Sequence, residues 1–181
     1  MSTIPGYKAG TWTIDAVHSD VSFSVRHMMV SKVKGRFGAF EGTIVTGEEP
    51  KDSSVSVSID LSSIDTNNAQ RDAHIKSADF FEVEAHPAMT FVSTKVTGSG
   101  DEWTITGDLT IKGITKSVDL ATEVGGFGPD PYGGFRAGFS ATTEISRKEF
   151  GVDIEMPLDG GGVVVGDKIS VALEIEAVYQ A

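Results

Sequence analysis

The sequence contains no cysteine and no long apolar run. Without cysteine the chain forms no disulfide and offers no thiolate to a metal or a substrate, although the redox compartment stays undecided. No segment reaches the roughly 20 apolar residues that a membrane-spanning helix needs, so we expect no integral membrane segment. Residues 1–10 lack the charged and then apolar regions of a secretion signal, and we therefore expect a soluble protein that stays in the cytoplasm.

Basic residues are also scarce. Lysine and arginine together number 15 against 26 aspartates and glutamates, which gives a formal net charge of -11. Binding to a nucleic-acid backbone needs a dense basic face, and attraction to anionic membranes needs positive charge as well. The composition therefore argues against nucleic acid as a partner and against general attraction to anionic membrane surfaces.

The motifs of common metal and hydrolase sites are missing too. The four histidines are scattered, with no His-Glu-x-x-His motif, so we expect no metal and no cofactor. Asp15, His18 and Ser19 are the residue types of a hydrolase triad, but they lie close together at a strand break, and the chain has no Gly-x-Ser-x-Gly motif. A turn held by side-chain hydrogen bonds is the better interpretation of this segment.

Alternation of apolar and polar residues dominates most of the chain and predicts β-strands. It is clearest from Val55 to Leu61, where every second residue is apolar and the intervening ones are serine or Asp60. The segment from residue 33 to 46 fits best as a strand bent near Gly38, because its apolar spacing is neither strictly alternating nor helical. The glycine-rich residues 125–134 are expected to form an irregular loop.

Many strands joined by tight turns are typical of an antiparallel sandwich or an up-and-down barrel. Several expected strands are long, and the last one has a face too apolar for solvent, so a closed barrel that removes exposed edges fits better. Small residues at expected inward positions favour a hollow interior; these are Gly42, Gly107, Ala137 and Ala141. We predict a single all-β domain over residues 11–181, an antiparallel up-and-down barrel of about eight strands, after an N-terminal extension at residues 1–10.

Residues 66–81 form the one long stretch that does not fit a strand. Thr66 or Asn67 would be suitable to cap a short helix at its start. We expect this helical insert to close one end of the barrel, with Phe80 and Phe81 pointing inward as its anchors.

The charged residues of the insert have two interpretations. The favoured one has Arg71, Asp72 and Asp79 fixing an irregular segment by hydrogen bonds, as a structural cap. In the other, Arg71 and His74 lie on neighbouring helical faces and meet a phosphate or a carbonyl at the barrel mouth, where a guanidinium can bind two oxygens. For His74 the two interpretations are about equally supported.

Several motifs, taken in order, resemble the YceI-like family of polyisoprenoid-binding, lipocalin-like barrels. They are DAVHS at 15–19, FSVRH at 23–27, GRFGAFEG at 35–42, RDAHI at 71–75, SADFF at 77–81, HPAMTF at 86–91, GDLTIKG at 107–113 and SRKEFG at 146–151. The resemblance runs from about residue 11 to residue 179. It implies a lipocalin-like barrel that binds an isoprenoid lipid, such as a polyprenyl phosphate or a quinone tail, without catalysis.

An apolar chain is held by buried area, at about 25 cal/mol per Å² removed from water, so a lumen lined by apolar side chains is sufficient. The residues expected to bind the ligand share inward positions or belong to the insert. They are Phe23, Val25, Phe37, Phe40, Ile59, His74, Phe80, Phe81, Phe91, Ile105, Leu109, Phe139 and Leu173.

Two other functions stay open at this point. One is an enzyme acting on a small apolar or lipid-like substrate, with His74 or His18 as acid or base; it requires a polar cluster inside the barrel. The other is a ligand-free structural or partner-binding barrel, with a filled interior and a large apolar patch outside. An outer sheet face also offers a surface for a homodimer.

Overall fold

Strands account for nearly all the regular structure in the computed structural model, which describes residues 4–27, 31–78, 80–152 and 165–181. The strands are β1 (Gly10–Ile14), β2 (Asp20–His27), β3 (Ser31–Phe37), β4 (Phe40–Thr46), β5 (Ser54–Asp60), β6 (Ile64–Asp65), β7 (Ala88–Ser99), β8 (Glu102–Ile111), β9 (Ile114–Pro129), β10 (Phe135–Ser146) and β11 (Val165–Gln180). The helices are α1 (Ala69–Lys76) and the short 3-10 turns η1 (Pro50–Asp52), η2 (Leu61–Ser63) and η3 (Arg147–Phe150). Among the described residues, none of the helices has the length and apolarity to cross a bilayer.

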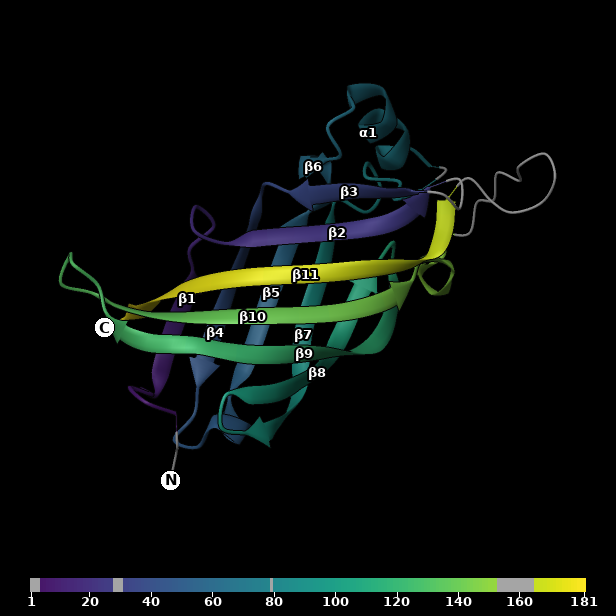
Figure 1. Ribbon diagram of the computed structural model, residues 1–181. Coiled ribbons are helices and arrows are strands. Elements are labelled where there is room, and N and C mark those ends of the chain that lie inside the picture. Colours follow the sequence, from purple (N-terminus) through teal and green to yellow (C-terminus); the bar gives the residue numbers. More distant parts are fainter. Residues whose placement is uncertain (1–3, 28–30, 79, 153–164) are drawn as a thin grey trace.

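A closed ring of strands forms the barrel wall. Its order is β1-β4-β5-β7-β8-β9-β10-β11, and β11 returns to pair with β1. From β11 the sheet also continues through β2 and β3 to β6, which carries the wall toward α1 (Figure 1). The strand pairings are antiparallel. The predicted all-β antiparallel barrel with a short helical insert is therefore confirmed.

Three of the wall strands are interrupted. β1 and β2 both pair with β11, one on each side of a break at residues 15–19. β3 and β4 are separated only by Gly38 and Ala39, and β5 and β6 only by η2. Each of these pairs of consecutive strands forms one long strand with a kink. The barrel wall therefore has the same number of strands at both of its ends. The bend expected near Gly38 is thus confirmed.

β9 extends further than the sequence predicted. The prediction of an irregular loop over residues 125–134 is wrong for residues 125–129, because β9 runs to Pro129 and Phe127 pairs with Ala137 of β10; residues 130–134 do lie between the two strands. The register of this pair shifts, which leaves Gly125 as the extra residue of a β-bulge. β9 therefore continues through the bulge at Gly125, and only a tight turn separates β9 from β10.

An aromatic plug closes one end of the barrel. It consists of Trp12, Phe127, Phe135 and Tyr179, with ring centroids 5.1 to 6.0 Å from that of Trp12. Trp12 is only 1% exposed, and its indole nitrogen donates a hydrogen bond to Thr46 Oγ1 at 2.9 Å. Because a buried indole N–H needs an acceptor, Thr46 allows the largest side chain of the core to lie here.

Candidate functional site

The barrel encloses a cavity of about 400 Å³. Its lining runs from Ile14 and Ile44, beside the aromatic plug, to Ile75 and Phe80 of the insert. Here the insert means residues 66–78 and 80–87, between β6 and β7. Small-molecule sites in proteins span about 300–1,000 Å³, so the cavity has the size of a ligand site.

Every residue that the sequence analysis assigned to ligand binding lines this cavity. The set comprises Phe23, Val25, Phe37, Phe40, Ile59, His74, Phe80, Phe81, Phe91, Ile105, Leu109, Phe139 and Leu173. Strand alternation places them, since successive side chains point to opposite faces and every second residue enters the lumen. Which of these residues contact a bound chain stays a prediction.

The cavity lining also includes residues that the prediction left out. Ile14, Ile44 and Ile175 follow the same inward alternation and could have been found by extending it. Arg26 carried no such signal, because a charged residue in a strand pattern is normally assigned to the solvent face. Arg147 lies in η3, where no strand alternation could place it.

The ionisable side chains of the described lining are arginines and one histidine. Arg26, Arg71, His74 and Arg147 come from β2, α1 and η3, and the described lining residues include no aspartate or glutamate. The aromatic plug lies at the start of β10, and Arg147 directly follows the end of that strand. The cavity therefore has an apolar closed end and a basic end near the insert.

Arg147 is buried, with 4% of its surface exposed. Its Nε donates to Gly166 O at 2.9 Å and its Nη1 donates to Val152 O at 2.7 Å. Next to it, Asp167 accepts a hydrogen bond from Ser146 Oγ at 2.7 Å. Burial opposes ionisation of Asp167, but its hydrogen bonds outweigh that effect and lower its pKa. The guanidinium is thus fixed where β10, η3 and β11 meet.

Thr66, Arg71 and Asp72 form a group of hydrogen bonds at the start of the insert, which we call the Thr66 latch. Asp72 Oδ1 accepts from Thr66 N at 3.0 Å and also from the Thr66 hydroxyl. Arg71 Nε donates to Thr66 Oγ1 at 2.8 Å, and its Nη2 donates to Thr66 O. Arg71 and Asp72 thus bond within the insert, as the structural-cap interpretation expected, while Asp79 lies outside the described residues.

The N-cap of the insert's helix lies one residue after Asn67 and two after Thr66, the two predicted caps. Asn68 is its N-cap, with Oδ1 accepting a hydrogen bond from Arg71 N at 2.9 Å. The expectation of a Thr66 or Asn67 cap is wrong, because Thr66 belongs to the latch and Asn67 has a left-handed φ of 64°. An N-cap residue needs extended backbone, which Asn68 supplies.

The aromatics of the insert face the cavity. Phe80 is 8% exposed, and its ring packs edge-on against His74 with centroids 5.0 Å apart. Phe81 is half-buried and packs against the main hydrophobic core. His74 is itself exposed although it borders the cavity, so it lies at the mouth.

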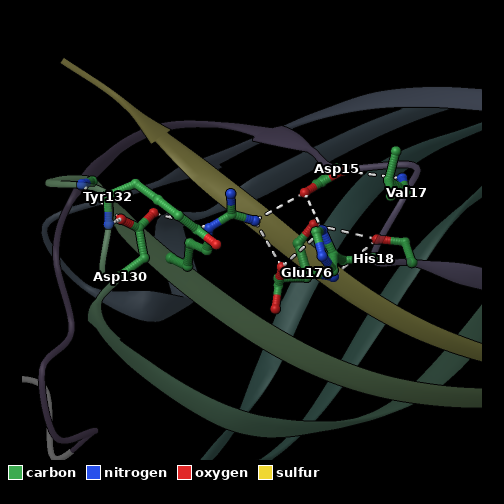
Figure 2. Close-up of polar contacts among 9 residues, drawn as sticks. Asp15, Val17, His18, Asp130, Tyr132 and Glu176 are labelled. Carbon is green, nitrogen blue, oxygen red and sulfur yellow. Dashed lines mark hydrogen bonds and ion pairs between the residues drawn. The ribbon is translucent and has the colours of Figure 1, made fainter.

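A second polar cluster, the Arg136 network, lies near the plugged end and outside the cavity lining. Arg136 Nη1 contacts Asp15 Oδ2 at 2.8 Å and Glu176 Oε2 at 2.7 Å, and its Nε contacts Asp130 Oδ2 at 3.0 Å. Figure 2 shows Asp15, His18 and Glu176 pointing toward one another, with Asp130 on the far side of the network. The Arg136 guanidinium, and after it the His18 ring, hold the pKa of Asp15 at about 2.

The triad residue types at the break between β1 and β2 do not assemble as a triad. His18 Nδ1 lies 2.7 Å from Asp15 Oδ2, but Ser19 Oγ accepts from Glu176 N at 3.0 Å and donates to Glu176 O. Ser19 therefore fastens the break to β11, and Asp15 Oδ1 accepts from Val17 N at 3.0 Å within the turn. These contacts describe a turn held by side-chain hydrogen bonds.

The same place brings three metal-binding groups together. One ligand atom each from Asp15, His18 and Glu176 lies within 4.8 Å of the others. Arg136 already donates to one carboxylate oxygen of Asp15 and to one of Glu176. A metal ion would have to compete with this guanidinium, so the cluster is an ion-pair network in the structure.

Known proteins share both the sequence and the fold. A family model for the YceI-like domain matches residues 12–177. Protein YceI of Escherichia coli O157:H7 is 44% identical over 140 residues, which cover 77% of this chain and 73% of that protein. A Campylobacter jejuni YceI protein of known structure has a TM-score of 0.74 and 29% identity, covering 86% of this chain and 90% of that one.

The fold extends to more distant proteins. A polyisoprenoid-binding domain from Saccharophagus degradans, implicated in plant cell wall breakdown, has a TM-score of 0.74 at 15% identity, covering 96% of this chain and 100% of that one. At that identity the likeness concerns the fold alone. The family model and the Escherichia coli relative cover most of this chain, and the chain therefore belongs to the YceI-like family.

Proposed function

We propose that this protein binds one long apolar chain of isoprenoid type in its barrel cavity, and carries, stores or sequesters it without chemical change. The observation that carries this proposal is the hollow lumen of about 400 Å³, lined by apolar side chains from every part of the wall. A purely structural barrel of this size would fill its interior with side chains instead.

The apolar lining can supply the main favourable free energy of binding. A chain that loses roughly 400 Å² of apolar surface to the lumen would gain about 10 kcal/mol. The cost of association, about 4–15 kcal/mol, is of the same order as this gain. Contacts between the ligand's head and the basic end of the cavity would therefore add to the affinity.

The shape of the cavity favours an elongated ligand entering tail first. The aromatic plug closes one end, so the chain's apolar tip would lie near Ile14 and Phe139. Its head would then lie at the end bordered by Arg71, His74 and Arg147, where a phosphate or a carbonyl would meet hydrogen-bond donors. The isoprenoid class is supported by the shared fold of the Saccharophagus degradans domain that is named for polyisoprenoid binding.

A non-enzymatic role is better supported than catalysis by His18 or His74. His18 belongs to the Arg136 network and is absent from the cavity lining. His74 borders the cavity with Arg26, Arg71 and Arg147, but the described lining residues include no aspartate, glutamate or cysteine that could act with it in acid–base chemistry. A binding protein needs no such partner.

Organic extraction of the purified protein, followed by mass spectrometry, tests this proposal. We expect a prenyl compound in a ratio near one per barrel, and rebinding of that compound by the extracted protein. If the extract holds no lipid and the extracted protein binds no prenyl alcohol, the proposal is wrong.

A further inference from the structure

Phe23 and Gly35 form a matched pair on the inner wall. They lie directly opposite each other on β2 and β3, and the residues two positions from Gly35, Val33 and Phe37, line the cavity. A Cβ atom built on Gly35 would lie 2.4 Å from Phe23 Cζ and 2.8 Å from its Cε1. The tip of the phenylalanine ring therefore occupies the place that a side chain at position 35 would need.

Phe91 and Gly107 make a similar contact between β7 and β8, although they lie diagonally across the strand pair, with Phe91 opposite Leu109 and Gly107 opposite Ser93. Gly107 lies between Ile105 and Leu109, which both line the cavity, so strand alternation places it on the inner face as well. A Cβ atom on Gly107 would lie 2.4 Å from Phe91 Cζ and 2.7 Å from its Cε1. The two pairs occupy separate parts of the wall, since β7 and β8 are not neighbours of β2 and β3.

Neither glycine is required by its backbone conformation. Gly35 and Gly107 are not among the glycines with positive φ, so alanine could adopt the same dihedral angles. Glycine inside a strand lowers stability and often marks a place where another group approaches closely. Here the close group is an aromatic ring, which lies against the wall instead of crossing the lumen.

We infer that Gly35 and Gly107 set the width of the lumen, and with it the preference for methyl-branched isoprenoid chains over straight alkyl chains. This inference rests on the proposed function, because it assigns a ligand class to the same cavity. A methyl group at either position would push the tip of a phenylalanine ring toward the barrel axis. The narrowed lumen would still admit a straight chain but would collide with the methyl branches of an isoprenoid.

Gly35 is a better position than Gly107 for a substitution that tests this inference. The nearest atoms to a methyl group at this position belong to the Phe23 ring, whose tip can move, and the next is Thr66 Cγ2 at 2.9 Å, which the Thr66 latch holds in place. At Gly107 the backbone oxygen of Val92 also lies within 2.7 Å and resists displacement. Gly38 provides a matched control, because a Cβ there meets no atom within 4 Å.

The experiment uses the full chain after lipid extraction and measures displacement of cis-parinaric acid by geranylgeraniol and by 1-hexadecanol. Gly35→Ala should weaken geranylgeraniol binding by about tenfold and change hexadecanol binding far less. Adding Phe23→Leu to Gly35→Ala should restore geranylgeraniol binding, and Gly38→Ala should match the wild type. If Gly35→Ala does not fold, Gly107→Ala with Phe91→Leu as its rescue takes its place.

Equal weakening of both alcohols, or no recovery in the double variant, would overturn the inference while leaving lipid binding intact. A wild type that binds neither alcohol would instead refute the proposed function. In that case crystal structures of the wild type and of Gly35→Ala test the effect of Gly35 on the lumen without a ligand. A Phe23 ring that has moved into the lumen in Gly35→Ala supports the inference, and an unmoved ring refutes it.

Discussion

Arg136 Nη1 lies 2.8 Å from Asp15 Oδ2, and this contact joins β10 to the break between β1 and β2 across 121 residues of sequence. The same nitrogen lies 2.7 Å from Glu176 Oε2 on β11. One guanidinium therefore links the break between β1 and β2 to β10 and β11, close to the aromatic plug. Arg136, Asp15 and Glu176 do not line the cavity, so these contacts lie outside it.

Asp15 should make the stability of the barrel depend on pH in the acid range. Its pKa is about 2 in the folded protein against 3.8 ordinarily, because Arg136 and then His18 stabilise the carboxylate. A lowered pKa stabilises the fold above the ordinary value, and this contribution is lost as the pH falls from 3.8 toward 2. Asp15→Asn should therefore lower the free energy of unfolding by about 1 kcal/mol at neutral pH.

Urea denaturation of both proteins across this pH range checks the prediction. The difference between wild type and Asp15→Asn should be constant above about pH 5 and shrink below it. A difference that stays the same down to pH 2 would show that ionised Asp15 does not supply the stability.

The Thr66 latch should hold the insert in place. Asp72→Ala removes the carboxylate that accepts from the backbone and hydroxyl of Thr66, which is only 3% exposed. A buried donor left without its charged acceptor costs about 2 kcal/mol. Hydrogen exchange followed by mass spectrometry should show faster exchange in the insert and unchanged protection in β8 to β10. Glu84→Ala, at an exposed position of the insert, is the control and should leave the exchange unchanged.

If Asp72→Ala accelerates exchange evenly over the whole barrel, the latch supports global folding and has no local role at the mouth. That result would contradict the assignment of the insert as a separately held cap.

Trp12 should support the plugged end without affecting ligand capacity. Trp12→Phe keeps a ring in the plug but removes the hydrogen bond to Thr46, which should cost about 1 kcal/mol in the free energy of unfolding. Trp12→Ala should cost about 3–5 kcal/mol, because it leaves a large cavity. Trp12 does not line the cavity, so Trp12→Phe should bind prenyl alcohols as the wild type does. A clear loss of binding in Trp12→Phe would show that the cavity extends into the plug.

Most strands of the barrel wall could be predicted from the sequence, because strand alternation is a local property. In β5, Val55, Val57 and Ile59 alternate with polar residues, and the same rule placed the inward aromatics of other strands correctly in the lumen. Alternation carries no information about partners, so the double pairing of β11 with β1 and β2 could not be predicted.

The errors arise where the local sequence does not decide the structure. Glycines normally mark turns, but Gly125 sits in a bulge that lets β9 continue, and a bulge depends on the partner strand. Asn67 and Asn68 are chemically identical as caps, and only the backbone conformation decides between them. The Arg136 network joins residues far apart in sequence, so no spacing rule could have found it.

We propose that the lumen of the barrel holds the lipid. The most direct test compares lipid extracted from three proteins produced side by side: wild type, Ala141→Phe, which fills the lumen from a cavity-lining position, and Ala121→Phe, which adds the same ring at an exposed position of β9. We predict a prenyl compound near one per barrel in the wild type and in Ala121→Phe, and almost none in a folded Ala141→Phe. Equal amounts of lipid from all three proteins would contradict binding in the lumen.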